Sequence, residues 1–294
     1  MEEQPAIKRR SLLRRCFVSE DDRLRAGWRV AMFLTFGFAL LLLASSLLHR
    51  YGEGINRGGW SAGLLLLSWY MLTRFDRRSF HTLGFWFYDG WWKEALWGLG
   101  LGVGLIGAVA LGMRVAGVVT FARADASAFL SVLPKIAFMF LTAALFEELA
   151  FRGYPFQRLM ETWGTWGAVA FFSAFFGFAH WNNPGSTLLS TVNTMLAGIL
   201  LAQAYLKTRG LWLPLGLHWS WNFCLGPLLS LPVSGGKFEP ALLSATVNGP
   251  QWLTGGNYGP EGSILLTAAC TGAIVLLWRT QVLTPSPAMR EVLQ

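Results

Sequence analysis

Long stretches without any Asp, Glu, Lys or Arg limit the folds that are open to this chain. A helix needs about 20 mostly apolar residues to cross a bilayer. With 53% hydrophobic and only 14% charged residues, the chain has the composition of an integral membrane protein. The uncharged stretches are Val30 to His49, Gly58 to Thr73, Ala95 to Met113, Thr162 to Leu206, Gly210 to Gly236 and Gly262 to Trp278.

This pattern predicts an all-α fold, a polytopic membrane helix bundle of about eight transmembrane helices. We expect a single transmembrane domain over residues 27–280, with the functional core at about 130–230. The predicted helices cover residues 27–48, 58–74, 91–113, 130–157, 164–181, 186–206, 211–230 and 262–279.

Lys and Arg predict the orientation, because they gather in short cytoplasmic loops. With the N-terminus inside, 18 basic residues, Arg152 among them, lie on the inner side and 6 on the outer side. We therefore expect a multi-pass protein of the cell membrane with both termini in the cytoplasm, namely the basic segment 1–26 and the tail 281–294. Topology and anionic lipid explain the net charge of +8, and nucleic acid is not an expected partner.

Residues 231–261 are rich in Gly and Pro and predict an external loop with no regular core of its own. Two roles are open to this segment. It is either a connector between helices, which is the favoured interpretation, or a cap over an active site.

The stretch FEELAFRG places three ionisable residues inside a predicted span, where such residues usually have a function. Glu148 and Arg152 stand four residues apart on one helix face, so we expect them to form an ion pair. Glu147 points about 100° away and has no helical partner. A lone carboxylate in a low-dielectric site is a candidate general base, and a structural ion network is the alternative.

Two further motifs place polar side chains in apolar helices. In FGFAHWNN, Phe176 and His180 lie four residues apart, and in GLHWSWNF, His218 and Asn222 have the same spacing. Taken alone, each motif is also compatible with a buried core histidine or with hydrogen bonding between helices. If they meet Glu147, they concentrate the reactive groups of the chain in one site, and hydrolysis becomes the leading class of reaction.

The motifs EExxxR, FxxxH and HxxxN follow one another in this order within residues 140–225. This arrangement resembles the CAAX protease and bacteriocin-processing family of intramembrane proteases, which includes the type II CAAX prenyl endopeptidases. The resemblance implies a glutamate-dependent peptidase with its site between helices. The first 120 residues share only membrane spans with the family.

The resemblance also implies a role for each matching residue. Glu147 would activate water, and His180 would help to hold or deprotonate it. His218 and Asn222 would donate hydrogen bonds to the developing oxyanion.

Glu148, Arg152 and Phe176 are the supporting residues in this scheme, and the first two would hold the helix and orient its neighbour. Zinc bound by Glu147, His180 and His218 is the competing chemistry. Since the HExxH motif of common zinc peptidases is absent from the sequence, we favour chemistry that requires no cofactor.

The proposed site requires Glu147 and His180 to lie at the same depth in the membrane. If the fifth helix begins at Trp163 on the inner face, His180 lies about 25 Å higher, too far from Glu147. We therefore expect the fourth helix to continue to about Met160. We also expect the fifth helix to start near Ala168 and to break at WNNPG, inside a cavity.

The leading hypothesis is an intramembrane endopeptidase that cleaves a membrane-associated peptide or a lipidated protein within the lipid bilayer. A transporter or proton relay that uses the same Glu and His residues is one alternative. A non-catalytic scaffold or immunity protein is another. The sequence leaves the oligomeric state open.

Overall fold

The computed structural model describes residues 16–18 and 23–293. Most of the basic N-terminal segment, including Lys8, Arg9, Arg10, Arg14 and Arg15, lies outside the described residues.

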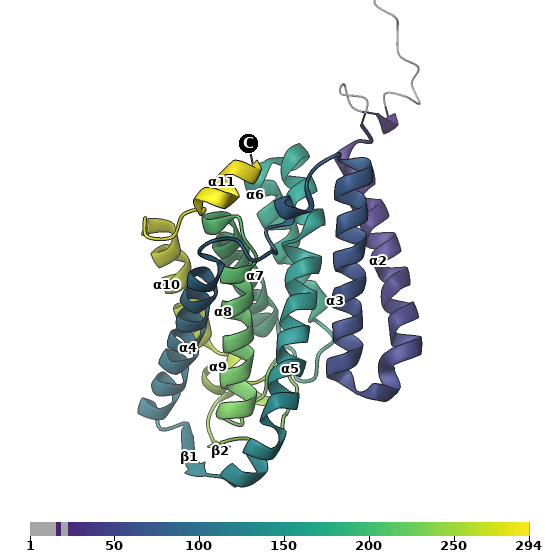
Figure 1. Cartoon of the computed structure of the whole chain (residues 1–294). Coiled ribbons are helices and arrows are strands. Elements are labelled where there is room, and N and C mark those ends of the chain that lie inside the picture. Colours follow the sequence, from purple (N-terminus) through teal and green to yellow (C-terminus); the bar gives the residue numbers. More distant parts are fainter. Residues whose placement is uncertain (1–15, 19–22, 294) are drawn as a thin grey trace, which may run out of the picture.

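Helices occupy all eight predicted positions, and the fold is the predicted all-α membrane bundle (Figure 1). The short helices α9, Gln251–Thr254, and α11, Pro287–Leu293, add to them. The eight helices are α2 (Ala26–Leu48), α3 (Glu53–Tyr70), α4 (Trp91–Val115), α5 (Ala126–Phe151), α6 (Tyr154–Ala179), α7 (Leu188–Thr208), α8 (Trp212–Phe223) and α10 (Ile264–Arg279).

Within the described residues, four helical stretches are long and apolar enough to cross a membrane. One of them contains both α5 and α6, while α10 is apolar but shorter. The helices α3 and α8 are not among the four. The stretches are Ala26–Tyr51, Trp91–Val115, Ala126–Ala179 and Leu188–Thr208.

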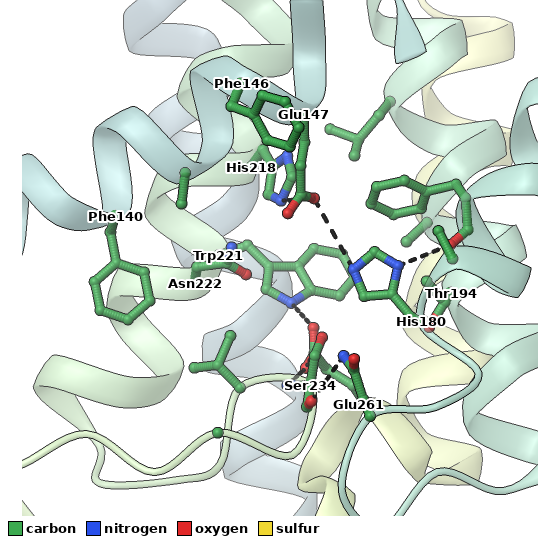
Figure 2. Close-up of a pocket in the computed structure, with 18 of the residues that line it drawn as sticks. Phe140, Phe146, Glu147, His180, Thr194, His218, Trp221, Asn222, Ser234 and Glu261 are labelled. Atoms are coloured by element: carbon green, nitrogen blue, oxygen red, sulfur yellow. Dashed lines mark hydrogen bonds and ion pairs between the residues drawn. The ribbon is translucent and has the colours of Figure 1, made fainter. Parts of the chain in front are cut away.

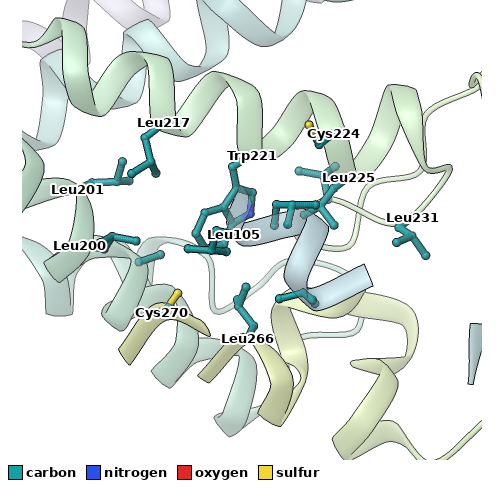
Figure 3. Close-up of a cluster of buried hydrophobic side chains, with 14 of the residues drawn as sticks. Leu105, Leu200, Leu201, Leu217, Trp221, Cys224, Leu225, Leu231, Leu266 and Cys270 are labelled. Atoms are coloured by element: carbon teal, nitrogen blue, oxygen red, sulfur yellow. The ribbon is translucent and has the colours of Figure 1, made fainter. Parts of the chain in front are cut away.

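The helices surround two apolar cores. The core in Figure 3 lies where α4, α7, α8 and α10 meet, and it includes Leu105, Leu200, Leu217, Trp221 and Leu266. The second core joins α2 and α3 to α6. In Figure 1, α5 stands between the pair α2 and α3 on one side and the group α4, α8 and α10 on the other.

The connection between α5 and α6 differs from the prediction. The helix predicted at 130–157, with an extension to Met160, ends at Phe151, and α6 begins at Tyr154 instead of near Ala168. Pro155 favours a helix start here, because proline lacks the N–H that the first turn leaves unpaired anyway. A second break follows at Gly164, where φ is +71°.

These breaks bring His180 and Glu147 to the same depth, which was the reason for predicting the extension to Met160. The first part of α6 rises about 15 Å at 1.5 Å per residue before the chain bends at Gly164 and runs back. The predicted break after this helix is present, because His180 ends α6 and WNNPG forms turns. Glu147 thus lies well inside the bundle, level with the returning end of α6.

An ion network fastens the first part of α6 to α2. Arg29 of α2 contacts both Asp76 and Glu161, and Arg158 contacts the same two carboxylates at 3.4 and 2.8 Å. Arg78 adds a contact to Glu161 at 3.1 Å. Because Asp76 is completely buried, its charge depends on these guanidinium groups for compensation.

The segment 231–261, here called the cap segment, contains short elements of regular structure that pack against the rest of the bundle. Its strand β2, Leu243–Val247, pairs antiparallel with β1, Val119–Arg123. The helix α9 and two short 3₁₀ turns follow. The partner strand lies more than 100 residues earlier, so local sequence patterns carried no sign of the pairing.

Glycines let α4 and α8 approach closely. A Cβ atom added at Gly98 would meet the backbone of α8, with Leu217 N at 2.8 Å and Gly216 Cα at 3.1 Å. Gly100, on the same helix, has open space around it. Small residues are the usual means of close helix packing in membranes.

We predict that Gly98→Ala lowers the thermal stability of the detergent-solubilised protein, because overpacking costs about 1–3 kcal/mol. Gly100→Ala is the matched control and should be neutral or slightly stabilising, since Ala favours a helix over Gly by about 1 kcal/mol. Equal melting temperatures for the two variants would contradict this account of the α4–α8 contact.

Candidate active site

The two adjacent glutamates lie in the last turn of α5 and face different surroundings. Glu148 is completely buried and pairs with Arg152 at 3.3 Å, so the predicted ion pair is present. Arg152, which the charge count placed on the cytoplasmic side, is buried too, and it donates to the carbonyl of Gly198 on α7. Glu147 lines a cavity instead.

His218 reaches the same pair of glutamates from α8. Its Nδ1 lies 2.7 Å from Glu148 Oε1, and its Nε2 lies 3.6 Å from Glu147 Oε2. Since a carboxylate accepts hydrogen bonds, Nδ1 carries the proton in this contact, and Nε2 points toward Glu147. Glu148 therefore orients a histidine, a role that its predicted pairing with Arg152 alone did not include.

His180 is the first residue after α6, and a hydrogen bond to the backbone carbonyl of Phe176 fixes the orientation of its ring. Its Nδ1 lies 2.7 Å from the carbonyl oxygen of Phe176, which only accepts, so Nδ1 donates. The other nitrogen, Nε2, lies 4.0 Å from Glu147 Oε2. Figure 2 shows Glu147 between the two imidazoles.

Phe176 is more than a spacer in the FxxxH motif. Its ring lies 4.7 Å from the ring of His180 and 6.2 Å from that of His218, and the guanidinium of Arg152 lies over it at 4.7 Å. The ring thus fills the space among both imidazoles and the buried cation. It limits how far either histidine can rotate.

The reactive groups line one cavity of about 510 Å³. Asn222, one turn beyond His218 on α8, lines it as well, next to Trp221 in Figure 2. The structure thus brings all four predicted catalytic residues to a single cavity. Their roles in a reaction stay predictions.

The cap segment contributes a buried carboxylate that the sequence analysis missed. Glu261 accepts hydrogen bonds from Trp221 Nε1 at 2.9 Å and from Ser234 Oγ at 3.0 Å, and also from the backbone N–H of Ser234. Burial raises the pKa of Glu261, while its donors act in the opposite direction. Asn183 donates to the carbonyl of Ser234 at 3.0 Å and ties the cap to the end of α6.

The cap interpretation of residues 231–261, which was not the favoured one, therefore describes the structure better than a plain connector does. Ser234, Phe238 and Glu261 all line the cavity that contains Glu147. One signal for Glu261 was available, because it is an isolated carboxylate directly before the apolar run 262–278. Its partners in α8 and in the cap segment are visible only in the fold.

The donor types at the site match those that zinc uses, namely two imidazole nitrogens and a carboxylate oxygen. Among the described residues, however, no group of three or more His, Cys, Asp and Glu side chains is placed to hold a metal ion. A metal centre at Glu147 would require these side chains to move. A chelator tests this alternative directly.

Residues 129–224 match the family described as Type II CAAX prenyl endopeptidase Rce1-like. The match covers nearly all of α5 and runs through α8, so it includes every residue of the three motifs. Glu261 and the cap segment lie outside it. Neither a curated protein nor a solved structure matches the chain.

We predict that Glu261→Gln loosens the cap segment. The amide offers one acceptor oxygen where the carboxylate offers two. Either Trp221 or Ser234 therefore loses its hydrogen bond to residue 261. The loss of a buried hydrogen bond costs about 1–3 kcal/mol. Limited proteolysis within residues 231–261 should become several-fold faster.

Glu239→Gln is the control, because exposed Glu239 belongs to the same segment and accepts from Ser230 Oγ at 2.8 Å. Proteolysis of this variant should match that of the wild type. If both variants are cleaved at the wild-type rate, Glu261 does not fasten the cap.

Proposed function

Because residues 129–224 belong to the Rce1-like type II CAAX prenyl endopeptidases, we propose that this intramembrane endopeptidase uses Glu147 to activate the water that attacks the peptide bond. The observation that carries the proposal is the approach of Glu147 Oε2 to the Nε2 atoms of His180 and His218, at 4.0 and 3.6 Å. These distances exceed a direct hydrogen bond and suit a bridging water molecule.

The tautomer of His180 supports this role. Because Nδ1 donates to the carbonyl of Phe176, neutral His180 presents an unprotonated Nε2. A water molecule between Glu147 and His180 can then donate one O–H hydrogen bond to each of them. Its lone pairs point away from both, toward a substrate carbonyl carbon in the cavity.

His218 and Asn222 are the proposed donors to the oxyanion. In its doubly protonated form, His218 donates an Nδ1–H hydrogen bond to Glu148 and directs Nε2–H into the cavity. Asn222 lines the same cavity one helical turn away and supplies an amide N–H. Donors that are fixed before the reaction stabilise the developing negative charge without reorganisation.

Proton transfer completes the reaction. The water oxygen bonds to the carbonyl carbon while Glu147 takes the water proton. When the carbon–nitrogen bond breaks, Glu147 returns that proton to the leaving amine nitrogen. The products are a carboxylic acid and an amine, so one water molecule is consumed in each cycle.

The cavity wall indicates the substrate class. Phe140, Phe146 and Phe238 line the cavity together with the reactive groups. Such a wall suits an apolar side chain or a hydrocarbon chain next to the scissile bond. We therefore propose a membrane-associated peptide or a lipidated protein as the substrate.

We predict that Glu147→Gln lowers the rate of peptide cleavage by at least about 100-fold, because general base catalysis contributes about 10²–10⁴-fold. The measurement is cleavage of a quenched membrane-peptide library by purified protein in detergent. His49→Ala is the control, since His49 directly follows α2, its ring forms a hydrogen bond with the carbonyl of Ser45, and it does not line the cavity. Wild-type cleavage by Glu147→Gln would refute the proposal.

We expect a strong chelator to leave cleavage by the wild type unchanged, because the proposed steps use side chains and water alone. The same library is assayed before and after dialysis against the chelator, with zinc added back in a parallel sample. Loss of cleavage on chelation and its recovery with zinc would establish the metal mechanism instead.

A further inference from the structure

We propose that the scissile bond reaches Glu147 from the extracytoplasmic side of the membrane, so that the substrates are exported or outward-facing segments of membrane peptides. The inference rests on the proposed function, and it adds the side of the bilayer from which the substrate enters the cavity. It follows from where the cavity opens and from how the basic residues are distributed.

The cavity extends from Glu147 toward one end of the bundle. Glu53 and Arg57, in the first turns of α3, line it, and so does Pro184 in the turns after α6. The cap segment lies at the same end, where its strand β2 pairs with β1 in Figure 1. The start of α2 and the helix α11 lie at the opposite end of the bundle.

Toward that opposite end, large side chains fill the bundle behind the site. Leu149, Tyr154 and Phe156 are completely buried. Beyond them lies the network in which Arg158 contacts Asp76 and Glu161. A peptide that approached from the termini would have to displace these groups.

The mouth of the cavity differs in character from its interior. Arg57 and Glu53 form a pair at 3.4 Å, and the side chain of Glu53 is 60% exposed. Farther inside, Phe140 and Phe146 line the cavity with apolar surface. A peptide with a polar end in water and an apolar residue inside the bundle fits this gradient.

The basic residues assign the two ends to the two sides of the membrane. Lys and Arg accumulate in short cytoplasmic loops. In the described part of the chain, six basic residues belong to the cavity end and twelve to the end that holds the termini, while Arg152 is buried at the site between them. The six are Arg50, Arg57, Arg114, Arg123, Lys135 and Lys237, and the twelve are Arg23, Arg25, Arg29, Arg74, Arg77, Arg78, Lys93, Arg158, Lys207, Arg209, Arg279 and Arg290.

Membrane vesicles of defined orientation test the inference. A quenched peptide with a charged tail, which cannot cross the bilayer, is added to right-side-out and to inverted bacterial membrane vesicles that contain the full chain. We expect cleavage at least 10-fold faster in the right-side-out vesicles. Detergent should make the two rates equal. Faster cleavage in the inverted vesicles would overturn the proposal.

Thiol labelling tests the sidedness independently of catalysis. In a Cys16→Ser background, whose other cysteines are buried, we add Ser244→Cys in the exposed part of β2, Gln281→Cys after α10 or Asn183→Cys in the cavity wall. An impermeant maleimide should label positions 183 and 244 only in right-side-out vesicles and position 281 only in inverted ones. The opposite pattern would overturn the proposal.

The two measurements also separate the two proposals. If detergent-solubilised protein cleaves no peptide while the labelling pattern is as expected, the proposed function fails and the orientation stands. If cleavage occurs in detergent but the labels show the cavity facing the cytoplasm, the proposed function stands and the sidedness fails.

Discussion

The buried carboxylate of Glu148 is the contact on which the site depends. It pairs with Arg152 at 3.3 Å and accepts from His218 at 2.7 Å, and Arg152 donates in turn to the carbonyl of Gly198. Glu148 and Arg152 together thus link α5, α7 and α8 in the buried interior of the bundle. A charge in such a place is tolerated only when its partners are fixed. The same partners hold His218 in the direction of Glu147.

Breaks in the helices bring the remaining groups to this centre. An unbroken helix carries a side chain about 1.5 Å along the membrane normal with each residue, so continuous spans would separate Glu147 from His180. The break at Gly153 and the bend at Gly164 shift the returning part of α6 so that His180 ends level with Glu147. The break at Gly153 is buried in protein, which is the condition under which irregular backbone is tolerated inside a membrane.

The cap segment gives the site its second wall. Glu261 joins this segment to Trp221, which itself belongs to the core shared by α4, α7, α8 and α10. A change in the position of the cap is therefore coupled to the packing of the helix that carries His218. The cap also lies at the end of the cavity where Glu53 and Arg57 form its mouth, so it borders the route that we propose for the substrate.

The sequence by itself determined the membrane bundle, the positions of its helices and the four candidate residues, because these depend on local patterns. Uncharged stretches specify spans, and a spacing of four residues specifies a shared helix face. Only the tertiary structure decided that His218 binds Glu148, that α5 ends at Phe151, and that Glu261 fastens a cap. Each of these facts depends on residues far apart in the chain, and local patterns hold no information about such contacts.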